Sequence, residues 1–165
     1  MSFVYARVDS RLIHGQVGAK LVRYLNVNRI VLVDDSIAND AFMKQIYEYS
    51  AKACGAAVEI YSVDDAAKNY KAGRFDSKRN LLLFGSIDTA YRTLKAGIDF
   101  PELAVGSIKC DNPNMKLAYK LVYIYEEDAV KLREIQDNGV KVYFQLMPGD
   151  DKPVSIEDGI KTAGF

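Results

Sequence analysis

His14 is the only histidine of this chain, and it lies in the stretch RVDSRLIHGQV at residues 7–17. An imidazole held beside an anion site is a nucleophile suited to accepting a phosphoryl group. Arg11, three residues earlier, carries a permanent charge and a planar fork of N–H donors that matches phosphate oxygens. Gly15 lets the backbone come close to a ligand, and Gln16 adds a further backbone donor. These residue types predict a loop that binds and accepts a phosphoryl group, with His14 and Arg11 as candidate catalytic residues.

The same stretch also has a purely structural interpretation. His14 follows the apolar pair Leu12 and Ile13, so its ring could simply pack against them. Arg7 could be a salt-bridge partner of Asp9, and Asp9 could hold the turn by accepting from nearby backbone amides. The residues alone leave both interpretations open.

Seven short apolar runs, rich in branched or aromatic residues, predict the strands that would position this loop. Continuous runs of this kind are typical of strands buried on both faces, as in a parallel sheet covered by helices. The predicted strands are residues 3–8, 29–33, 56–62, 80–85, 102–108, 120–125 and 140–146.

Segments between these runs carry helical signals. Ser36 is the predicted cap of a helix through residues 41–54, and acidic residues open a helix at 126–136. Three helices are predicted to end at a glycine, which takes the left-handed cap conformation without steric cost, at Gly73, Gly97 and Gly139. This alternation predicts a single α/β domain over residues 1–165, a three-layer α/β/α fold with a mostly parallel sheet of about six or seven strands.

Ligands of such folds bind outside the carboxyl ends of the strands. Residues 9–14 follow the first strand, and Gly15 opens the next helix, whose first N–H groups favour an anion. We therefore expect His14 to be substantially exposed and Arg11 to reach toward the same space.

Other predicted strand ends supply a rim around this loop, at residues 33–35, 85–87 and 107–119. In the last of these, polar residues and Pro113 predict an irregular and potentially functional loop. Lys109 within it could face an acidic partner or the phosphoryl group, or be solvated. Capping of the following helices is the favoured role of three rim residues, Asp34, Asp35 and Ser86.

The composition narrows the class of protein. The 22 basic and 22 acidic residues balance, and no basic stripe indicates nucleic-acid binding. Cys54 and Cys110 stand apart from each other and from a ligand-like histidine, which favours free thiols in a cytoplasmic protein over a disulfide or zinc site. No apolar stretch approaches the roughly 18 residues of a membrane span, and neither a nucleotide-binding G-x-x-x-x-G-K-[ST] string nor a metal-ligand cluster occurs.

The stretch RVDSRLIHGQV resembles the R-[IV]-D-x-R-L-I-H-G-Q-V signature of the IIB subunits of the mannose–fructose–sorbose class of the bacterial phosphoenolpyruvate-dependent sugar phosphotransferase system (PTS). Looser similarity covers nearly the whole chain: residues 30–44 resemble the family's second strand and following helix, and residues 123–150 its C-terminal unit. The tryptophan often found in the family's first helix is absent. Residues 103–112 keep only Gly106 of the usual turn after the fifth strand.

The resemblance implies a phosphotransferase, the EIIB component of this system, that works without a cofactor or metal. His14 matches the histidine that accepts a phosphoryl group, on Nδ1, from a phosphohistidine of the IIA protein and passes it to a sugar held by the membrane subunits IIC and IID. Arg11 matches the arginine that steadies the phosphoryl group, while Asp9 and Arg7 would support the loop and the backbone of Gly15 and Gln16 would add donors. The implied location is cytoplasmic, peripheral to the membrane through the partner subunits.

Two other functions compete with this one. A regulatory or degenerate IIB-like subunit would dock IIA without passing phosphate onward. An unrelated phosphate- or nucleotide-binding α/β domain would bind nucleotides in isolation, which a IIB subunit would not do.

Overall fold

A seven-stranded sheet forms the centre of the computed structural model, which describes residues 2–165. Its strands are β1 (Phe3–Val8), β2 (Arg29–Val33), β3 (Ala57–Tyr61), β4 (Asn80–Phe84), β5 (Glu102–Val105), β8 (Lys141–Phe144) and β9 (Val154–Ser155). They lie in the order β3-β2-β4-β1-β5-β8-β9, and every neighbouring pair is parallel except β8 and β9. The mostly parallel sheet that the apolar runs predicted is therefore confirmed.

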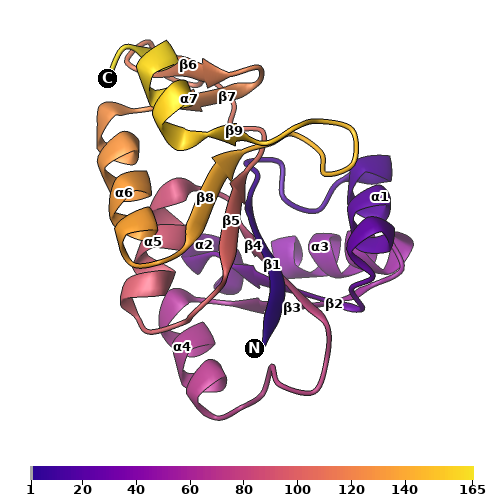
Figure 1. The fold of residues 1–165 in the computed structure, drawn as a ribbon. Coiled ribbons are helices and arrows are strands. Elements are labelled where there is room, and N and C mark those ends of the chain that lie inside the picture. The colour runs from indigo at the N-terminus through magenta and orange to yellow at the C-terminus, as the bar shows by residue number, and fades with distance from the viewer. Residues whose placement is uncertain (1) are drawn as a thin grey trace.

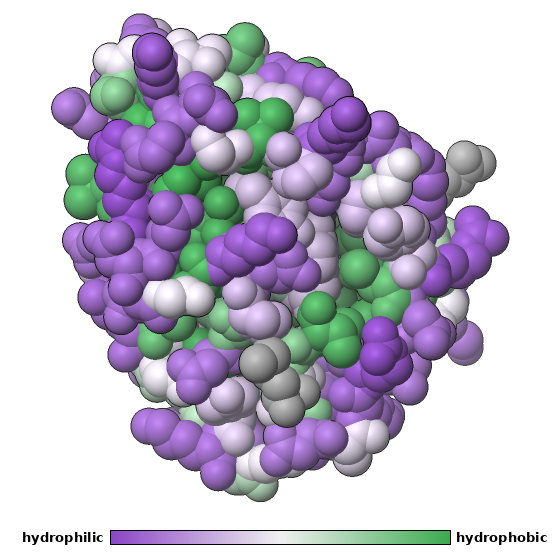
Figure 2. Space-filling view, in the orientation of Figure 1, coloured by the Kyte–Doolittle hydropathy of each residue, from purple (hydrophilic) through white to green (hydrophobic). Residues whose placement is uncertain are grey.

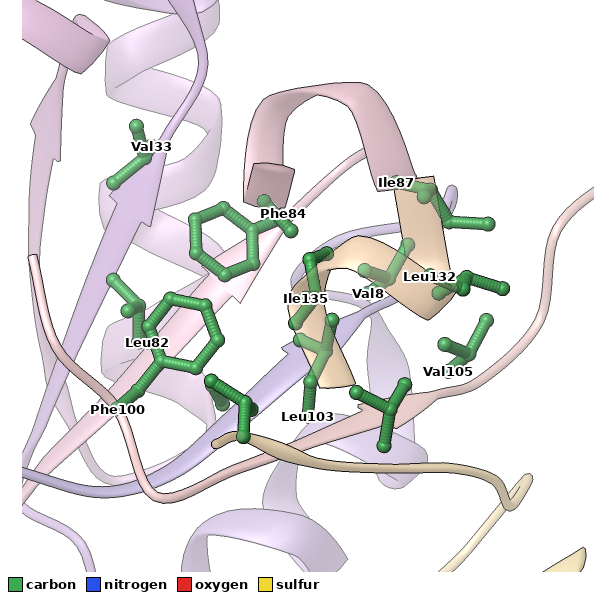
Figure 3. Packing of buried hydrophobic residues seen from close by; sticks show 14 of the residues in the cluster. Val8, Val33, Leu82, Phe84, Ile87, Phe100, Leu103, Val105, Leu132 and Ile135 are labelled. Atoms are coloured by element: carbon green, nitrogen blue, oxygen red, sulfur yellow. The ribbon is translucent and has the colours of Figure 1, made fainter. Parts of the chain in front are cut away.

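Helices cover both faces of the sheet (Figure 1). One face carries α1 (Gly15–Leu25), α2 (Asp35–Ala38) and α3 (Ala41–Ala53), and the other carries α4 (Val63–Lys71), α5 (Ile87–Lys95), α6 (Glu126–Asp137) and α7 (Ile156–Ala163). In the second layer Phe84 lies beside Phe100 with ring centroids 6.0 Å apart, and Ile135 of α6 lies over Leu103 (Figure 3). The three layers are thus α/β/α, as predicted, and burial on both faces explains why the strands read as continuous apolar runs.

The helix boundaries agree with the glycine signals but correct one cap. The predicted C-terminal glycines all have positive φ, between 73° and 92°, at Gly73, Gly97 and Gly139. Ser36 was the wrong N-cap for the helix through residues 41–54. Asp34 caps the short α2, and Asp40 caps α3 by accepting from the N–H groups of Phe42 and Met43. Each aspartate caps a helix of its own, so the chain forms two helices here instead of one.

The predicted strand at 120–125 belongs to a different sheet. β6 (Lys116–Tyr119) and β7 (Val122–Ile124) form a separate antiparallel pair. Only two residues connect them, and Lys120 turns the chain at φ 42°. Parallel pairing needs a much longer crossover, so this segment makes a hairpin. Regular structure at β6 also shows that the prediction of an irregular loop through 119 was wrong at its C-terminal end.

Hydrophilic residues dominate the molecular face drawn in Figure 2, where hydrophobic residues form separate patches. Among residues 2–165, no helix has the length and apolar character needed to cross a membrane.

Candidate functional site

The histidine loop, residues 9–14, connects β1 to α1 at the carboxyl edge of the sheet. The N–H of Asp9 donates to the carbonyl of Phe84 at the end of β4, at 2.9 Å. On the other side, the N–H of Ser10 donates to the carbonyl of Ser107, just beyond β5, at 2.8 Å. Because β1 lies between β4 and β5, both neighbours hold the loop at the edge where ligands of this fold bind.

Asp9 is the buried anchor of this loop. Its Oδ2 is 3.0 Å from Nη2 of Arg7 and 3.2 Å from Nη2 of Arg11, and its Oδ1 accepts from Nε of Arg11 at 3.1 Å. The same Oδ1 accepts from the backbone N–H of Arg11, also at 3.1 Å. One carboxylate therefore holds two guanidinium groups, which leaves a net positive charge at the loop. The structural roles expected for Arg7 and Asp9, as a salt bridge and a turn anchor, are both confirmed.

Arg7 carries this charge deep into the protein, since its side chain is only 1% exposed. Beyond Asp9, it donates to the carbonyls of Gln145 (3.2 Å) and Leu146 (2.6 Å), which follow β8. Gly106 lies close to the guanidinium: a β-carbon there would be 2.2 Å from Nη2 of Arg7. This close approach gives a physical reason for the one glycine in the turn after β5.

His14 occupies the N-cap position of α1 with an extended backbone, its side chain makes no capping hydrogen bond, and the residue is half-buried. Its Nδ1 is 2.9 Å from the carbonyl oxygen of Leu12. Because a carbonyl only accepts, this contact requires the proton on Nδ1. Nε2 is buried, and no described residue forms a hydrogen bond with it. The ring borders a cavity of about 20 Å³ whose other walls are mostly apolar and include Leu21 and Val22 of α1.

Two expectations about the loop are corrected by this geometry. His14 is not substantially exposed, because the bond to Leu12 turns its ring toward the cavity under α1. Arg11 does not share that space: its side chain is 42% exposed, is paired with Asp9, and borders a different cleft. The sequence predicted that both residues belong to one loop, but in the structure they border different cavities.

The cleft beside Arg11 has a volume of about 520 Å³. Ser10 and Arg11 form one wall, and strand-end residues 85–87 form another. Lys109 also borders the cleft, and its backbone N–H donates to Oγ of Ser10 at 3.2 Å. Two of the three predicted rim segments, 85–87 and part of 107–119, therefore do meet beside the loop.

The third rim segment does not reach the cleft. Asp34 caps α2, as favoured, whereas Asp35 accepts from the N–H of Val63 at 2.9 Å and from Nη1 of Arg92 at 2.8 Å. The Val63 bond comes first among the causes that hold the pKa of Asp35 below its usual value. Ser86 caps α5 by accepting from the N–H of Thr89, which confirms its expected role.

The first turns of α6 supply cleft residues that the sequence did not predict. Tyr125, Asp128 and Lys131 border the same cleft as Arg11. Lys131 is 2.7 Å from Oδ1 of Asp88, and this bond is the main cause of the lowered pKa of Asp88. Burial raises the pKa of Asp128. The only sequence signal was the acidic start of this helix, which reads as ordinary helix stabilisation.

The first turn of α1 remains the candidate phosphate-binding element. Gly15 has φ 42°, a conformation that glycine adopts without strain, and it lies directly after His14. N–H groups in a first helical turn have no carbonyl partner within the helix, so they can bind an anion. The side chain of Gln16 lies outside the described part of the structure. Within residues 2–165, no group of three or more His, Cys, Asp or Glu side chains is arranged to hold a metal ion.

A family model for the sorbose-subfamily IIB component of the PTS matches residues 3–165. The chain belongs to this family. The match covers the histidine loop, the sheet and α7, so the resemblance seen in one motif extends over the fold. It also removes the alternative of an unrelated nucleotide-binding domain.

Individual relatives agree with the family model. The N-acetylgalactosamine-specific phosphotransferase enzyme IIB component 1 of Escherichia coli K12 is 28% identical over 151 residues, 92% of this chain and 94% of that protein. The crystal structure of the IIBSor domain of the sorbose permease from Klebsiella pneumoniae superposes with a TM-score of 0.89 at 27% identity, covering 100% and 99% of the two chains. The mannose-specific EIIAB component of E. coli K12 is 25% identical over 147 residues, which are 89% of this chain and 45% of that longer protein.

Proposed function

We propose that this chain is a phosphocarrier that accepts a phosphoryl group on His14 from the phosphohistidine of a IIA protein and transfers it to a sugar during uptake. The observation that carries the proposal is the position of the only histidine. His14 stands between β1 and α1 at the central carboxyl edge of the sheet, in a chain of the PTS IIB family. A charged arginine–carboxylate cluster holds the loop beside it.

Phosphoryl transfer between two imidazoles needs positioning and charge stabilisation more than covalent work by other groups. A bond forms from a His14 nitrogen to phosphorus while the donor's nitrogen–phosphorus bond breaks, and the donor imidazole recovers its electron pair. Alignment of the two rings can contribute roughly 7–11 kcal/mol to lowering the barrier. Arg11 would stabilise the equatorial oxygens with the guanidinium N–H groups that Asp9 does not use, an effect worth up to about 10³–10⁵ in rate in other phosphoryl-transfer enzymes.

The attacking nitrogen determines what must happen to the ring first. Transfer to Nδ1, as the family resemblance implies, requires that Nδ1 give up its proton and its bond to Leu12. The proton must then reside on Nε2, which requires access to solvent.

The proposed partners are a IIA protein and the membrane subunits IIC and IID, which would hold the sugar. The relative whose name joins A and B components, the mannose-specific EIIAB component, supports a IIA partner. The cleft beside Arg11 and the loop edge form the proposed docking surface. Binding to these partners would hold the chain in the cytoplasm, at the membrane surface. Nucleic acid is not among the proposed partners.

One observation favours the second function, a IIB-like subunit that docks IIA without onward transfer. The ring of His14 is half-buried, and Nε2 has no access to an external phosphate. A transfer assay with all partners separates the two functions, because only a carrier delivers phosphate to the sugar.

Phosphorylation of His14 is tested by incubating the chain with phosphoenolpyruvate and the upstream phosphocarriers, followed by mass measurement. We expect one acid-labile phosphoryl adduct in the native chain and none in His14→Ala. Circular dichroism of His14→Ala serves as the folding control. An acid-stable adduct, or one that persists in His14→Ala, would contradict the proposal.

A further inference from the structure

We propose that His14 is sheltered in the free chain and that docking of the phosphoryl-donor protein releases its ring. This inference rests on the proposed function and adds a step to it. In the described conformation neither ring nitrogen can attack an external donor. Nδ1 carries the proton that it donates to the carbonyl of Leu12, and Nε2 is buried with no hydrogen-bond partner among the described residues. A nucleophilic nitrogen needs a free electron pair that the donor can reach.

The cavity under α1 is too small to admit a donor. Its volume of about 20 Å³ is close to the space that one water molecule occupies. Leu21, Val22 and Leu83 form much of its apolar wall. A phosphoryl group carried by another protein therefore cannot reach Nε2 from the cavity side. Nδ1, the proposed acceptor, becomes available only when the ring breaks its bond to the Leu12 carbonyl and turns away from it.

The residue that holds the ring is itself in an unusual conformation. Leu12 has φ 55°, in the left-handed region that leucine rarely adopts. Such a backbone persists only where its surroundings hold it. Here the Leu12 side chain is 8% exposed, and its N–H donates to the carbonyl of Asp9 at 2.9 Å. The carbonyl that accepts the hydrogen bond from Nδ1 thus belongs to a turn that is itself hydrogen-bonded to Asp9 of the ion-pair cluster.

The sheltered state is also easy to leave. One hydrogen bond and apolar contacts hold the ring, while Nε2 forgoes the hydrogen bond that water would give it. A partner that binds the loop edge more tightly when the ring is out would shift this equilibrium. Small phosphoryl donors make no such docking contacts, so the shelter would restrict His14 to protein donors.

The first experiment uses the single imidazole of the full-length chain as its own reporter. Nitrogen-15 NMR of the neutral ring is expected to show the proton on Nδ1, whereas free histidine favours Nε2. Carbethoxylation of His14 by diethyl pyrocarbonate is expected to be at least tenfold slower than that of Nα-acetylhistidine, equivalent to about 1.4 kcal/mol. A proton on Nε2, or a ratio below tenfold, overturns the proposal.

A pair of variants tests the cavity directly. Val22→Leu adds one methylene to the wall and overfills the cavity, so the ring is displaced and carbethoxylation accelerates at least threefold. Val142→Leu is the matched control, since Val142 is equally buried but packs in the core on the other face of the sheet. Its rate stays within twofold of the native chain. A threefold acceleration in Val142→Leu, or none in Val22→Leu, overturns the role of the cavity.

A third comparison separates this proposal from the proposed function. The native chain is incubated with phosphorylated IIA or with phosphoramidate. Phosphorylation by IIA together with a phosphoramidate rate at least tenfold below that of Nα-acetylhistidine supports the shelter, and a smaller ratio overturns it. If neither reagent phosphorylates the chain, the proposed function fails, while the tautomer and carbethoxylation results still decide whether the ring is sheltered.

Discussion

Replacing Gly106 with alanine would disturb the ion-pair cluster of Arg7, Asp9 and Arg11 without changing any of these three residues. The new β-carbon would lie 2.2 Å from Nη2, 2.5 Å from Cζ and 3.0 Å from Nη1 of Arg7. Ordinary carbon contacts begin near 3.4 Å, so Nη2 must retreat by 3.4 − 2.2, about 1.2 Å. Arg7 has little room to do so, because its side chain is only 1% exposed.

The size of the effect follows from what that retreat breaks. Nη2 of Arg7 bonds Oδ2 of Asp9 at 3.0 Å and the carbonyl of Leu146 at 2.6 Å, and a shift of about 1.2 Å is large enough to take either bond beyond hydrogen-bond range. Separating one partner from a buried ion pair costs about 3–5 kcal/mol. Asp9 keeps Arg11 as a second partner, which reduces the loss. We therefore expect Gly106→Ala to lower the free energy of unfolding by about 3 kcal/mol.

Urea unfolding followed by circular dichroism measures this change. Gly85→Ala is the matched control, because its β-carbon would meet Asp34 at 3.4 Å and Leu12 at 3.5 Å, which are ordinary contacts. That control is expected to change the free energy of unfolding by less than about 1 kcal/mol. If Gly106→Ala is as stable as Gly85→Ala with an unchanged denaturant slope, Arg7 is not held as described and the argument is refuted.

Three further predictions concern the loop, the acid range and the domain. Arg11→Ala is expected to slow phosphoryl transfer about 10²–10³-fold while scarcely affecting stability, because the Arg11 side chain is 42% exposed and Asp9 keeps its ion pair with Arg7. Arg11→Lys should recover only part of the transfer rate, and full recovery would show that charge alone matters. Lys131 lowers the pKa of Asp88, so the stability that this ion pair contributes is complete above the unfolded-state pKa of about 4 and is lost as the pH falls through the lower folded-state pKa. Asp88→Asn should weaken the acid dependence of the urea midpoint, and an unchanged acid dependence would contradict this prediction. The single domain predicted over residues 1–165 should unfold in one transition by circular dichroism and calorimetry, whereas two resolved transitions would reveal two domains.

The parts of the fold that were predictable from sequence are those that local chemistry decides. Continuous apolar runs such as 29–33 and 80–84 occur where both faces of a strand are covered, and β2 and β4 are fully buried. Gly73 and Gly97 end helices because only a residue without a β-carbon takes that cap freely. By contrast, the apolar run at 120–125 has the composition of a central strand. Only its two-residue connection to β6 sends it into a hairpin, and apolar pattern alone does not show that pairing.

The candidate site also has features that local sequence predicts and features that it does not. The motif identified His14, Arg11 and Asp9 as neighbours, because they occupy one short loop after a strand. It could not show that Asp9 bonds Nε and Nη2 of Arg11. Nor could it show that Nδ1 of His14 faces the backbone carbonyl of Leu12, a residue in the left-handed conformation. Leucine gives no sequence signal for that conformation. The consequence is chemical: Arg11 borders the cleft, whereas the imidazole of His14 borders the cavity under α1 together with Arg7 and Asp9. Under the proposed function, Arg11 and the ring could act on one phosphoryl group only after the ring moves. A partner that docks at the cleft would meet Arg11 before His14, which places binding ahead of chemistry in the order of events.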